Sequence, residues 1–416
     1  MTSAILAAAL FLVLTVVAHL ASVVLAWRRC RARPAGSGTA QAGRVSIVRP
    51  VCGLDTFEAE TLGSAFRLDH PDYEILFCVE RADDPVVPLV HRLIAAHPGV
   101  PAGLLVGNER ICANPKLNNV LKGWAAARGE WVVLADSNVL MPADYLQRLL
   151  AAWRADTGLV CSPPVGIRPE GFWAELECAF LNEYQARWQY AADSLGFGFA
   201  QGKSMLWRRA ELEAAGGIAA LGREIAEDAA ATKVVRAGGR RVRLVDGPFG
   251  QPLGRRAAMS VWRRQLRWAR LRRATFRLYF TPELLTGALF PAIAALVVAA
   301  HLGWPPAPSV LGLLTLWYGA ELALTLRAGW PVSPTTPLAL ILRDLLIPVL
   351  WVEAWRGSDF SWRGNAMTAT RARSTSMRAP SVRSLRPVSL RVGAVARRGS
   401  ERLARARATA ARWWRA

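Results

Sequence analysis

The stretch Trp131-Val-Val-Leu-Ala-Asp-Ser-Asn138 joins a short run of apolar, mostly β-forming residues directly to a carboxylate. A short apolar run bounded by turn residues is typical of a strand that is buried on both faces of a sheet. The carboxyl ends of parallel strands are where such sheets bind their ligands. The stretch therefore predicts a buried strand with a polar site at its end.

The region around this stretch alternates between strand-like and helix-like patterns. The other β-rich runs are 45–49, 74–79 and 103–106. The helical patterns between the runs are 56–67, 85–97 and 115–128. Strands that alternate with helices predict an α/β fold whose sheet is mostly parallel and covered on both faces.

Acids also follow a second predicted strand. The run 74–79 leads into Glu80-Arg-Ala-Asp-Asp84, as the run 131–135 leads into Asp136. Asp and Asn favour turns and helix caps, so either motif alone is more typical of a turn. Carboxylates at strand ends are also suited to holding Mg²⁺ together with substrate phosphates.

Other motifs of this region are weaker. Glu227-Asp228 begins a helical run, and alone it is typical of a helix N-terminus. The segment 196–202 lacks the glycine spacing of a dinucleotide loop, and it predicts a turn that brings backbone close to a ligand or a neighbouring element. The histidines form no metal-ligand spacing and the cysteines no CxxC pair, so neither a zinc site nor a disulfide framework is supported.

The N-terminus predicts a retained membrane anchor. Residues 2–27 carry no charge when His19 is neutral, and a cluster of arginines follows at 28–33. This length exceeds the roughly 20 residues that a helix needs to cross a bilayer. A cleaved signal peptide would have a shorter apolar core, with its charges before that core. The positive-inside rule places the arginines in the cytoplasm.

A second apolar block, 284–320, is uncharged and is split by the proline-rich stretch 303–308. Because consecutive prolines do not continue a helix, the block predicts a hairpin of two spans, at about 284–302 and 309–326. Glu321 lies within the second span and should face protein or water rather than lipid.

A third segment, 337–355, is long enough to cross but contains Arg343, Asp344 and Pro348. If it crosses, the arginine-rich C-terminal tail lies outside, against the positive-inside rule. If it is re-entrant or interfacial, the tail stays cytoplasmic. The second arrangement is favoured.

Residues 255–277 hold nine arginines and no acid. A basic amphipathic helix next to a membrane span is expected to lie in the membrane interface. One interpretation is that this helix only anchors the protein to lipid. The other is that Arg264, Arg267 and Trp268 also contact a phosphate, since arginine suits bidentate phosphate binding. The predicted apolar stripe comprises Met259, Trp262, Leu266 and Ala269.

The formal net charge is +21, and much of it lies at the C-terminus. Residues 363–416 contain fourteen arginines and a single acid, Glu401. Their bias toward Arg, Ala and Ser is typical of a disordered basic tail, or of a shifted reading frame. A basic protein that binds nucleic acid or anionic lipid without catalysis is one class that fits this charge.

The motifs taken in order are more specific than any one of them. The set runs from Asp83-Asp84-Pro85 through Asn114-Pro-Lys-Leu-Asn-Asn119, Asp136-Ser-Asn138 and Glu227-Asp228 to Arg264-Gln-Leu-Arg-Trp268. It resembles the ceramide glucosyltransferases, a membrane branch of the processive-type inverting glycosyltransferases with a GT-A fold. The resemblance covers roughly residues 3–365. The metal motif departs from the family's Asp-x-Asp, because it ends in Asn138 and so gives a metal one carboxylate fewer.

The resemblance implies roles for individual residues. Asp228 would be the catalytic general base, and Asp136 would bind a divalent metal, Mg²⁺ or Mn²⁺, on the diphosphate. Asp84, Asp136, Lys116 and Asn118 would bind the nucleotide sugar. The residues implied for the diphosphate and acceptor side are Arg264, Arg267, Trp268 and Gly202.

The function that the resemblance implies is transfer of a hexose or hexuronate from a UDP-sugar to the primary hydroxyl of ceramide, with inversion. A glycosyltransferase for hopanoids or other lipids is the alternative of the same fold. The implied enzyme is an integral membrane protein with a cytoplasmic catalytic domain, in the inner membrane if bacterial, and no nucleic-acid partner is expected. Its predicted divisions are an anchor (1–27), a basic flexible linker (28–43), a glycosyltransferase domain (44–254), an interfacial helix (255–280), a membrane cluster (281–362) and a basic tail (363–416).

Overall fold

The computed structural model describes residues 3–32, 43–362 and 365–369. Most of the predicted linker 28–43 and nearly all of the predicted tail 363–416 lie outside these residues.

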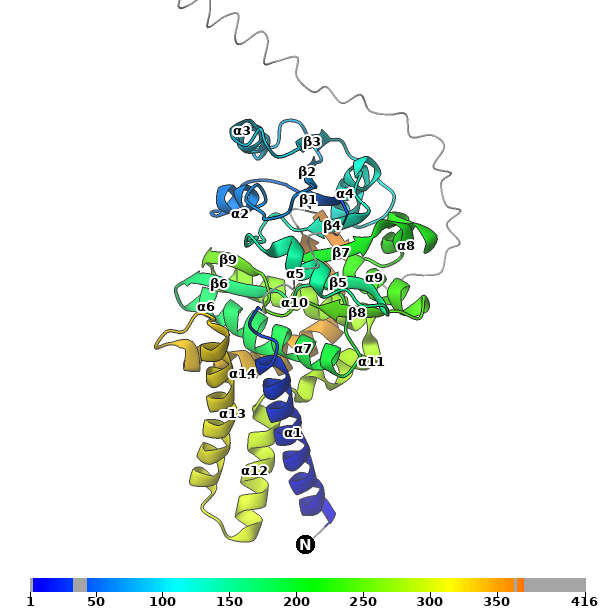
Figure 1. The fold of residues 1–416 in the computed structure, drawn as a ribbon. Helices are drawn as coiled ribbons and strands as arrows, with labels where there is room; N and C mark the ends of the chain where they lie inside the picture. The colour runs from blue at the N-terminus through cyan, green and yellow to red at the C-terminus, as the bar shows by residue number, and fades with distance from the viewer. Residues whose placement is uncertain (1–2, 33–42, 363–364, 370–416) are drawn as a thin grey trace, which may run out of the picture. The chain divides into compact units, whose positions relative to one another are not determined.

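A seven-stranded sheet forms the centre of the α/β region, with the order β3-β2-β1-β4-β7-β5-β8 (Figure 1). All neighbouring strands pair in parallel except β7, which runs antiparallel to both β4 and β5. The prediction of a mostly parallel sheet is therefore confirmed. The strands are β1 (Val45–Pro50), β2 (Tyr73–Val79), β3 (Ala102–Val106), β4 (Trp131–Ala135), β5 (Thr157–Cys161), β7 (Ser204–Arg208) and β8 (Arg241–Leu244).

Both faces of this sheet are buried. Side chains of successive residues in a strand point to opposite faces, and Ile47 and Val48 accordingly belong to two different clusters of the core. The same alternation holds for Val133 and Leu134 of β4. This explains why the strands are continuously apolar. The helices of this region are α2 (Glu58–Ser64), α3 (Val87–Ala96), α4 (Pro115–Ala126), α5 (Tyr145–Ala151), α8 (Arg209–Ala214), η3 (Ile218–Arg223) and α9 (Glu227–Ala237).

A second layer connects the sheet to the membrane helices. Strands β6 (Val165–Glu170) and β9 (Gly250–Arg255) pair in parallel, and a nearly continuous helical segment follows β6. This segment consists of α6 (Phe172–Ala179), the π-helical turn η2 (Phe180–Ala186) and α7 (Arg187–Ser194). A short hairpin, β10 (Asp359–Trp362) with β11 (Asn365–Thr368), lies near the end of the described chain.

The predicted basic helix is α10 (Ala258–Thr275), followed by α11 (Arg277–Phe280) and η4 (Thr281–Leu285). Its inner face agrees with the predicted stripe except at Met259, which is 54% exposed. Ala269 is buried, and Trp262 and Leu266 pack against the apolar core. Val261 and Gln265 are buried as well, because α10 packs on α6 and α14 (Thr336–Arg356).

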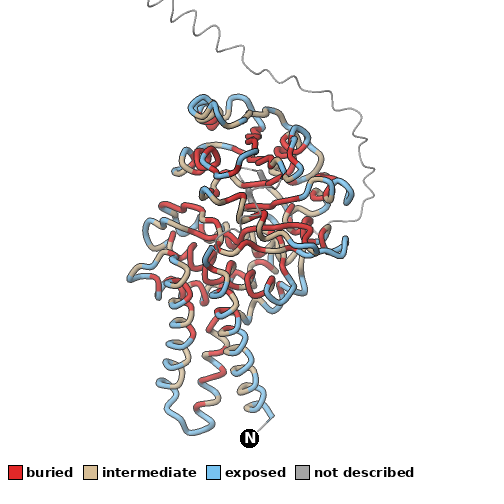
Figure 2. The backbone as a smooth tube through the Cα atoms, in the orientation of Figure 1, coloured by how far each residue is buried: buried red, intermediate tan, exposed pale blue. Residues whose placement is uncertain are grey.

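Three apolar helices lie side by side, α1 (Ser3–Trp27), α12 (Leu289–Leu302) and α13 (Pro306–Ala328) (Figure 1). Among the described residues, α1 and α13 are long and apolar enough to cross a membrane. Their exposed residues appear pale blue along the helices in Figure 2, and many of these are leucine or valine, such as Leu10, Leu14 and Leu311. Such surfaces suit lipid and indicate membrane association.

The hairpin between α12 and α13 breaks where the prolines predict, but its first helix is shorter than predicted. Gly303 ends α12 in the left-handed conformation, with φ of 68°. At its other end α12 begins only at Leu289, because the Asp344 carboxylate accepts the Ala288 N–H at 2.8 Å. A carboxylate at this position stabilises a helix N-terminus. The preceding segment, Arg277–Leu285, bends away by 47°.

Helix α14 is continuous through Pro348 and buries Arg343 and Asp344. Arg343 contacts Asp344 at 2.7 Å and Glu321 of α13 at 2.9 Å. Glu321 is fully buried and also lies 3.3 Å from Arg187, so the prediction that it faces protein is confirmed. Within the described chain, α14 is not among the helices apolar enough to cross a membrane, and it packs on α6 and α10. Its interfacial position stays a prediction.

Candidate active site

The carboxyl ends of β2 and β4, which flank β1, place Asp84 and Asp136 at one edge of the sheet. Strand β7 runs in the opposite direction, so its amino end reaches the same edge. Ala135 pairs with Ser204, and the Asp136 N–H donates to the Lys203 carbonyl at 3.0 Å. The antiparallel register therefore places Lys203 directly beside Asp136.

Both oxygens of the Asp136 carboxylate are paired with lysines. Lys116 Nζ lies 2.6 Å from Oδ1, and Lys203 Nζ lies 2.9 Å from Oδ2. The Lys203 ammonium also donates to Asn138 Oδ1 at 3.0 Å. The Asp136 side chain remains 24% exposed, so a ligand can still reach it.

Lys116 connects Asp136 to the start of α9. Its ammonium lies 2.7 Å from Glu227 Oε1 and donates to the Gly202 carbonyl at 2.7 Å. Asn114 fixes this arrangement, because its Oδ1 caps α4 by accepting the Leu117 N–H, while its Nδ2 donates to Glu227 Oε2 at 2.7 Å. The stretch 114–119 thus joins α4 to α9 through side-chain contacts.

The charges in this cluster shift one another's pKa values. Burial would raise the pKa of Asp136, but the ammonium groups of Lys116 and Lys203 outweigh it and hold this pKa well below its usual range. Burial likewise opposes the charge on Lys116, yet the carboxylates of Asp136 and Glu227 raise the pKa of Lys116 above its ordinary value. Asp136 and Lys116 are therefore both charged at neutral pH.

Asp228 behaves differently from Asp136. Burial, together with the neighbouring Glu227 carboxylate, raises the pKa of Asp228 to about 7, against the opposing effect of the Lys116 ammonium. Its Oδ1 accepts the N–H of Ala229 at 2.8 Å, and the backbone hydrogen bonds of Ala229 and Gly202 also oppose the rise of its pKa. A carboxylate with a pKa near neutrality is suited to accepting a proton in a reaction.

Gly202 leaves the room that this cluster needs. A Cβ at this position would lie 2.7 Å from Glu227 Oε1 and 3.1 Å from Lys116 Nζ. Both atoms are ends of flexible side chains, so an added methyl group would displace them rather than the backbone.

Gly202→Ala should therefore fold normally but disturb the cluster. We expect its melting temperature to stay close to that of the wild type and any activity of the site to fall at least roughly tenfold, because positioning errors near 1 Å carry large catalytic costs. Gly99→Ala is the control, since nothing lies within 4 Å of the place that its methyl group would take. Equal activity of both variants would show that the Gly202 contact is unimportant.

Other predicted residues lie near the cluster without joining it. Asp84 accepts the backbone N–H groups of Gly53 and Val86, both at 2.9 Å, and so holds the loop after β1. Asn118 accepts the N–H of Ile111 at 3.0 Å and donates to the Cys112 carbonyl at 2.9 Å. Both side chains thus shape loops at the sheet edge, and their nucleotide-binding roles stay predictions.

The predicted motif of α10 packs against α6. Arg264 forms an ion pair with Glu177 of α6, which is fully buried, and Arg256 lies 3.6 Å from the same carboxylate. Burial lowers the pKa of Lys203, and the charge of Arg264 adds to this effect, so Arg264 lies within electrostatic reach of the cluster. Trp268 packs against Cys178, Leu181 and Leu253.

Sequence reasoning missed four residues of this site. Lys203, Asn114, Glu177 and Glu227 were given no role of their own, although Glu227 and Asn114 lie in motifs that were noted. A usable signal was present for Lys203. The chain has only four lysines among its 52 basic residues, and two of them, Lys116 and Lys203, converge on Asp136.

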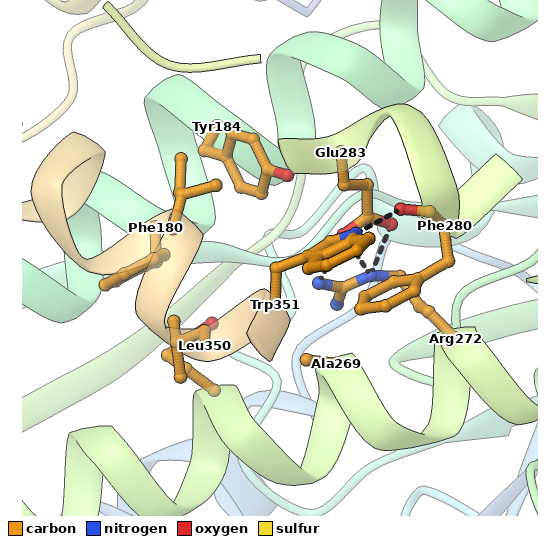
Figure 3. A pocket seen from close by; sticks show the side chains of 10 residues that line it. Phe180, Tyr184, Ala269, Arg272, Phe280, Glu283, Leu350 and Trp351 are labelled. Atoms are coloured by element: carbon orange, nitrogen blue, oxygen red, sulfur yellow. Dashed lines mark hydrogen bonds and ion pairs between the residues drawn. The ribbon is translucent and has the colours of Figure 1, made fainter. Parts of the chain in front are cut away.

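A pocket lies against α10, where Gln265, Ala269 and Arg272 line it (Figure 3). Arg272 and Glu283 form a bidentate ion pair in its wall, and Trp351 Nε1 donates to the Phe280 carbonyl. Gln265 is buried, and its Nε2 has no hydrogen-bond partner in the described structure. The remaining lining residues are Phe180, Tyr184, Ile347 and Leu350.

The side chains at the end of β4 fit a divalent cation only with help from a ligand. Among the described residues, no group of three or more His, Cys, Asp or Glu side chains could hold a metal ion. Asp136 and Asn138 supply one carboxylate and one amide oxygen. Mg²⁺ is commonly held by one or two carboxylates plus substrate phosphates and water, so this pair fits a cation that shares a phosphate ligand.

Comparison with known proteins identifies relatives across most of the chain. The sequence profile of glycosyl transferase family 21 matches residues 9–375. Ceramide glucosyltransferase 1 of Caenorhabditis elegans is 25% identical over 341 residues, which cover 78% of this chain and 73% of the relative. Ceramide glucosyltransferase 3 of the same organism is 27% identical over 331 residues, covering 77% and 72%.

A solved structure also aligns with the chain. It is a mannosyltransferase from Pyrobaculum calidifontis in complex with GDP-Man and Mn²⁺. The identity is 20%, the TM-score is 0.45, and the alignment covers 80% of this chain and 98% of the mannosyltransferase.

Proposed function

The chain belongs to glycosyl transferase family 21, and from this premise we propose that it transfers a hexose or hexuronate from a UDP-sugar to the primary hydroxyl of ceramide. Inversion at the anomeric carbon would give a β-glycosylceramide. The observation that carries the proposal is that the Lys116 ammonium, which pairs with Asp136 at 2.6 Å, also acts on Asp228, whose pKa is raised to about 7. The names of the worm relatives support ceramide as the acceptor.

Asp228 is the proposed general base. It takes the proton of the lipid hydroxyl as the hydroxyl oxygen attacks the anomeric carbon, and the diphosphate leaves from the opposite face. A pKa of about 7 keeps a large share of the carboxylate ionised at neutral pH while leaving it basic enough to accept a proton. Such a base typically contributes about 10²–10⁴-fold to the rate.

Negative charge develops on the diphosphate as it leaves, and basic side chains of this site are positioned to stabilise that charge. Lys116 and Lys203 are the ammonium groups beside Asp136, and Arg264 lies within electrostatic reach of Lys203. Fixed positive charges in a partly buried site stabilise such charge more than water does. Bound Mg²⁺ or Mn²⁺, held by Asp136 and Asn138, would supply further neutralisation of the diphosphate.

The acceptor is an amphiphile, and the architecture suits one. The apolar helices α1 and α13 would hold the protein at a membrane, and the basic helix α10, which the Arg264–Glu177 ion pair joins to α6, carries a charge within electrostatic reach of Lys203. The lipid tails would remain in the bilayer while the hydroxyl reaches Asp228. We place the catalytic domain on the cytoplasmic side because of the arginines that follow α1.

Gln265 offers a hydrogen-bond donor for the polar part of the lipid, because its Nε2 has no partner among the described residues while its Oε1 accepts from Gln185 Nε2 at 3.2 Å. Gln265→Leu should raise the KM for the lipid acceptor about tenfold, the usual cost of one lost hydrogen bond, while UDP affinity stays unchanged. Gln147→Leu, the same change at a distant exposed hydrogen bond, is the control. Initial rates at varied lipid concentration give the KM. An unchanged KM would remove Gln265 from acceptor binding.

The deciding experiment is a transfer assay. Full-length protein in nanodiscs is given ceramide, Mg²⁺ or Mn²⁺, and a panel of UDP-hexoses and UDP-uronates, with mass-spectrometric detection. We expect a metal-dependent hexosyl- or hexuronosyl-ceramide. Turnover with a hopanoid or diacylglycerol but not with ceramide would keep the reaction and overturn the acceptor.

The alternative that the chain is a non-catalytic binding protein, acting through its basic tail, is tested by a truncation. A protein that lacks residues 370–416, and so keeps the β10–β11 hairpin, should keep its transferase activity if the enzyme proposal is correct. Loss of all function in the truncated protein, with the folded yield unchanged, would favour a binding role of the basic tail.

A further inference from the structure

One ammonium group lies between the two oxygens that a metal at the end of β4 would use. Lys203 Nζ is 2.9 Å from Asp136 Oδ2 and 3.0 Å from Asn138 Oδ1. These two side chains are the metal-binding candidates at this strand end. A divalent cation and the Lys203 ammonium therefore compete for the same oxygens.

The second oxygen of Asp136 is also engaged. Lys116 Nζ lies 2.6 Å from Oδ1 and is itself held by Glu227 and the Gly202 carbonyl, each at 2.7 Å. Lys116 is thus tied on three sides, whereas Lys203 reaches only the pair at the end of β4 in the side-chain contacts of the described residues. Of the two lysines, Lys203 has fewer contacts and is therefore the one that can move away from Asp136.

The choice of lysine in this cluster is itself informative. The chain contains only four lysines, and its other basic residues are arginines. The ammonium group of lysine is a compact charge at the end of a flexible side chain, so it can occupy a position between two oxygens as a metal ion does. The guanidinium group of arginine is planar and larger. A lysine at position 203 fits the space between two oxygens and retains the freedom to move.

Charge balance decides when a metal can enter. Lys116 and Lys203 offset Asp136 and Glu227, so a divalent cation alone would add two positive charges beside two ammonium groups. A nucleoside diphosphate brings several negative charges to the same place. It would attract the Lys203 ammonium away from Asp136 and supply the oxygen ligands that the metal lacks.

We propose that Lys203 is the resident counter-ion of the metal site and gives way to a divalent cation only when a nucleoside diphosphate binds. Metal and nucleotide then bind as a coupled pair, and Lys203 passes from Asp136 to the diphosphate. This inference rests on the proposed function, because it takes the donor to be a sugar nucleotide.

The test measures metal binding directly. Full-length protein in nanodiscs is titrated with Mn²⁺, with and without UDP, and free Mn²⁺ is followed by electron paramagnetic resonance. We expect UDP to tighten wild-type Mn²⁺ binding at least tenfold, and Mn²⁺ to tighten UDP binding by the same factor. In Lys203→Met, Mn²⁺ should bind at least tenfold more tightly without UDP, and the coupling should shrink.

Two further variants keep the result interpretable. Lys203→Gln retains a polar side chain that donates hydrogen bonds but removes the charge, so it should behave like Lys203→Met even if the apolar variant folds poorly. Lys233→Met is the matched control, because Lys233 pairs with Glu224, away from Asp136, and should leave both affinities unchanged.

The outcomes separate this inference from the proposed function. If the protein glycosylates its lipid acceptor but neither Lys203 variant changes the Mn²⁺ affinity measured without UDP, the counter-ion role is wrong and the proposed function stands. If the folded wild type binds no UDP in the presence of Mn²⁺ and transfers no sugar, the proposed function and this inference both fail.

Discussion

Asp228→Asn is expected to abolish sugar transfer while UDP binding persists. The amide keeps the shape of the side chain but cannot accept the proton of the attacking hydroxyl, so the rate should fall about 10²–10⁴-fold or more. UDP affinity should change little, because the proposed diphosphate contacts are Lys116 and Lys203, which pair with Asp136 and are not altered by the substitution. Calorimetric UDP titration and the ceramide transfer assay measure the two quantities.

The pH dependence gives an independent check of the same assignment. The groups that face Asp228 are Glu227, which raises its pKa to about 7 together with burial, and Lys116, which opposes this rise. Because the base acts only when ionised, the wild-type rate should climb as pH rises through about 7. A rate that is flat between pH 6 and 8, or an active Asn variant, would exclude Asp228 as the base.

Stability should respond in the opposite direction. An unfolded Asp titrates near pH 4, whereas folded Asp228 titrates at about 7. The folded state therefore holds an extra proton in this window, and its stability falls as pH rises from about 4 through 7. Asp228→Asn removes this effect, so its gain in melting temperature over the wild type should be larger at pH 8 than at pH 5. Asp144→Asn, on an exposed side chain, is the control.

Arg343→Met should cause the largest loss of stability. Arg343 is almost fully buried and contacts Glu321 at 2.9 Å and Asp344 at 2.7 Å. Without it, Glu321 keeps Arg187 at 3.3 Å, and the described structure gives Asp344 no other basic side chain in ion-pair contact. Removing one partner of a buried ion pair typically costs about 3–5 kcal/mol, because the remaining charge is uncompensated. Thermal unfolding in detergent and the folded yield measure the loss.

A second substitution tests this explanation. Adding Glu321→Gln to Arg343→Met removes one of the stranded charges and should recover part of the stability, with a coupling of about 0.5–3 kcal/mol. Arg356→Met is the matched control, since its pair with Glu353 is largely exposed and is worth less than about 1 kcal/mol. A single Arg343 variant that melts like the wild type would show that the network is not needed for stability.

Much of the fold could be predicted because it depends on local patterns. Strand β4 has the predicted bounds, and β1, β2 and β3 agree within a residue. Helix α1 and the break before α13 also agree, since charge-free length and consecutive prolines act within their own segment. The shorter α12 was missed because its N-terminus is set by Asp344, about 56 positions away in the chain.

The candidate site divides in the same way. The sequence by itself determined that carboxylates follow buried strands, and parallel neighbours bring Asp84 and Asp136 to one edge whatever else the chain does. The tertiary structure alone decided that β7 runs antiparallel, and this direction places Lys203 against Asp136. The physical reason is that apolar periodicity reports which faces of a strand are buried, and burial is the same for either direction. Strand direction and charge pairing arise only when distant segments pack together.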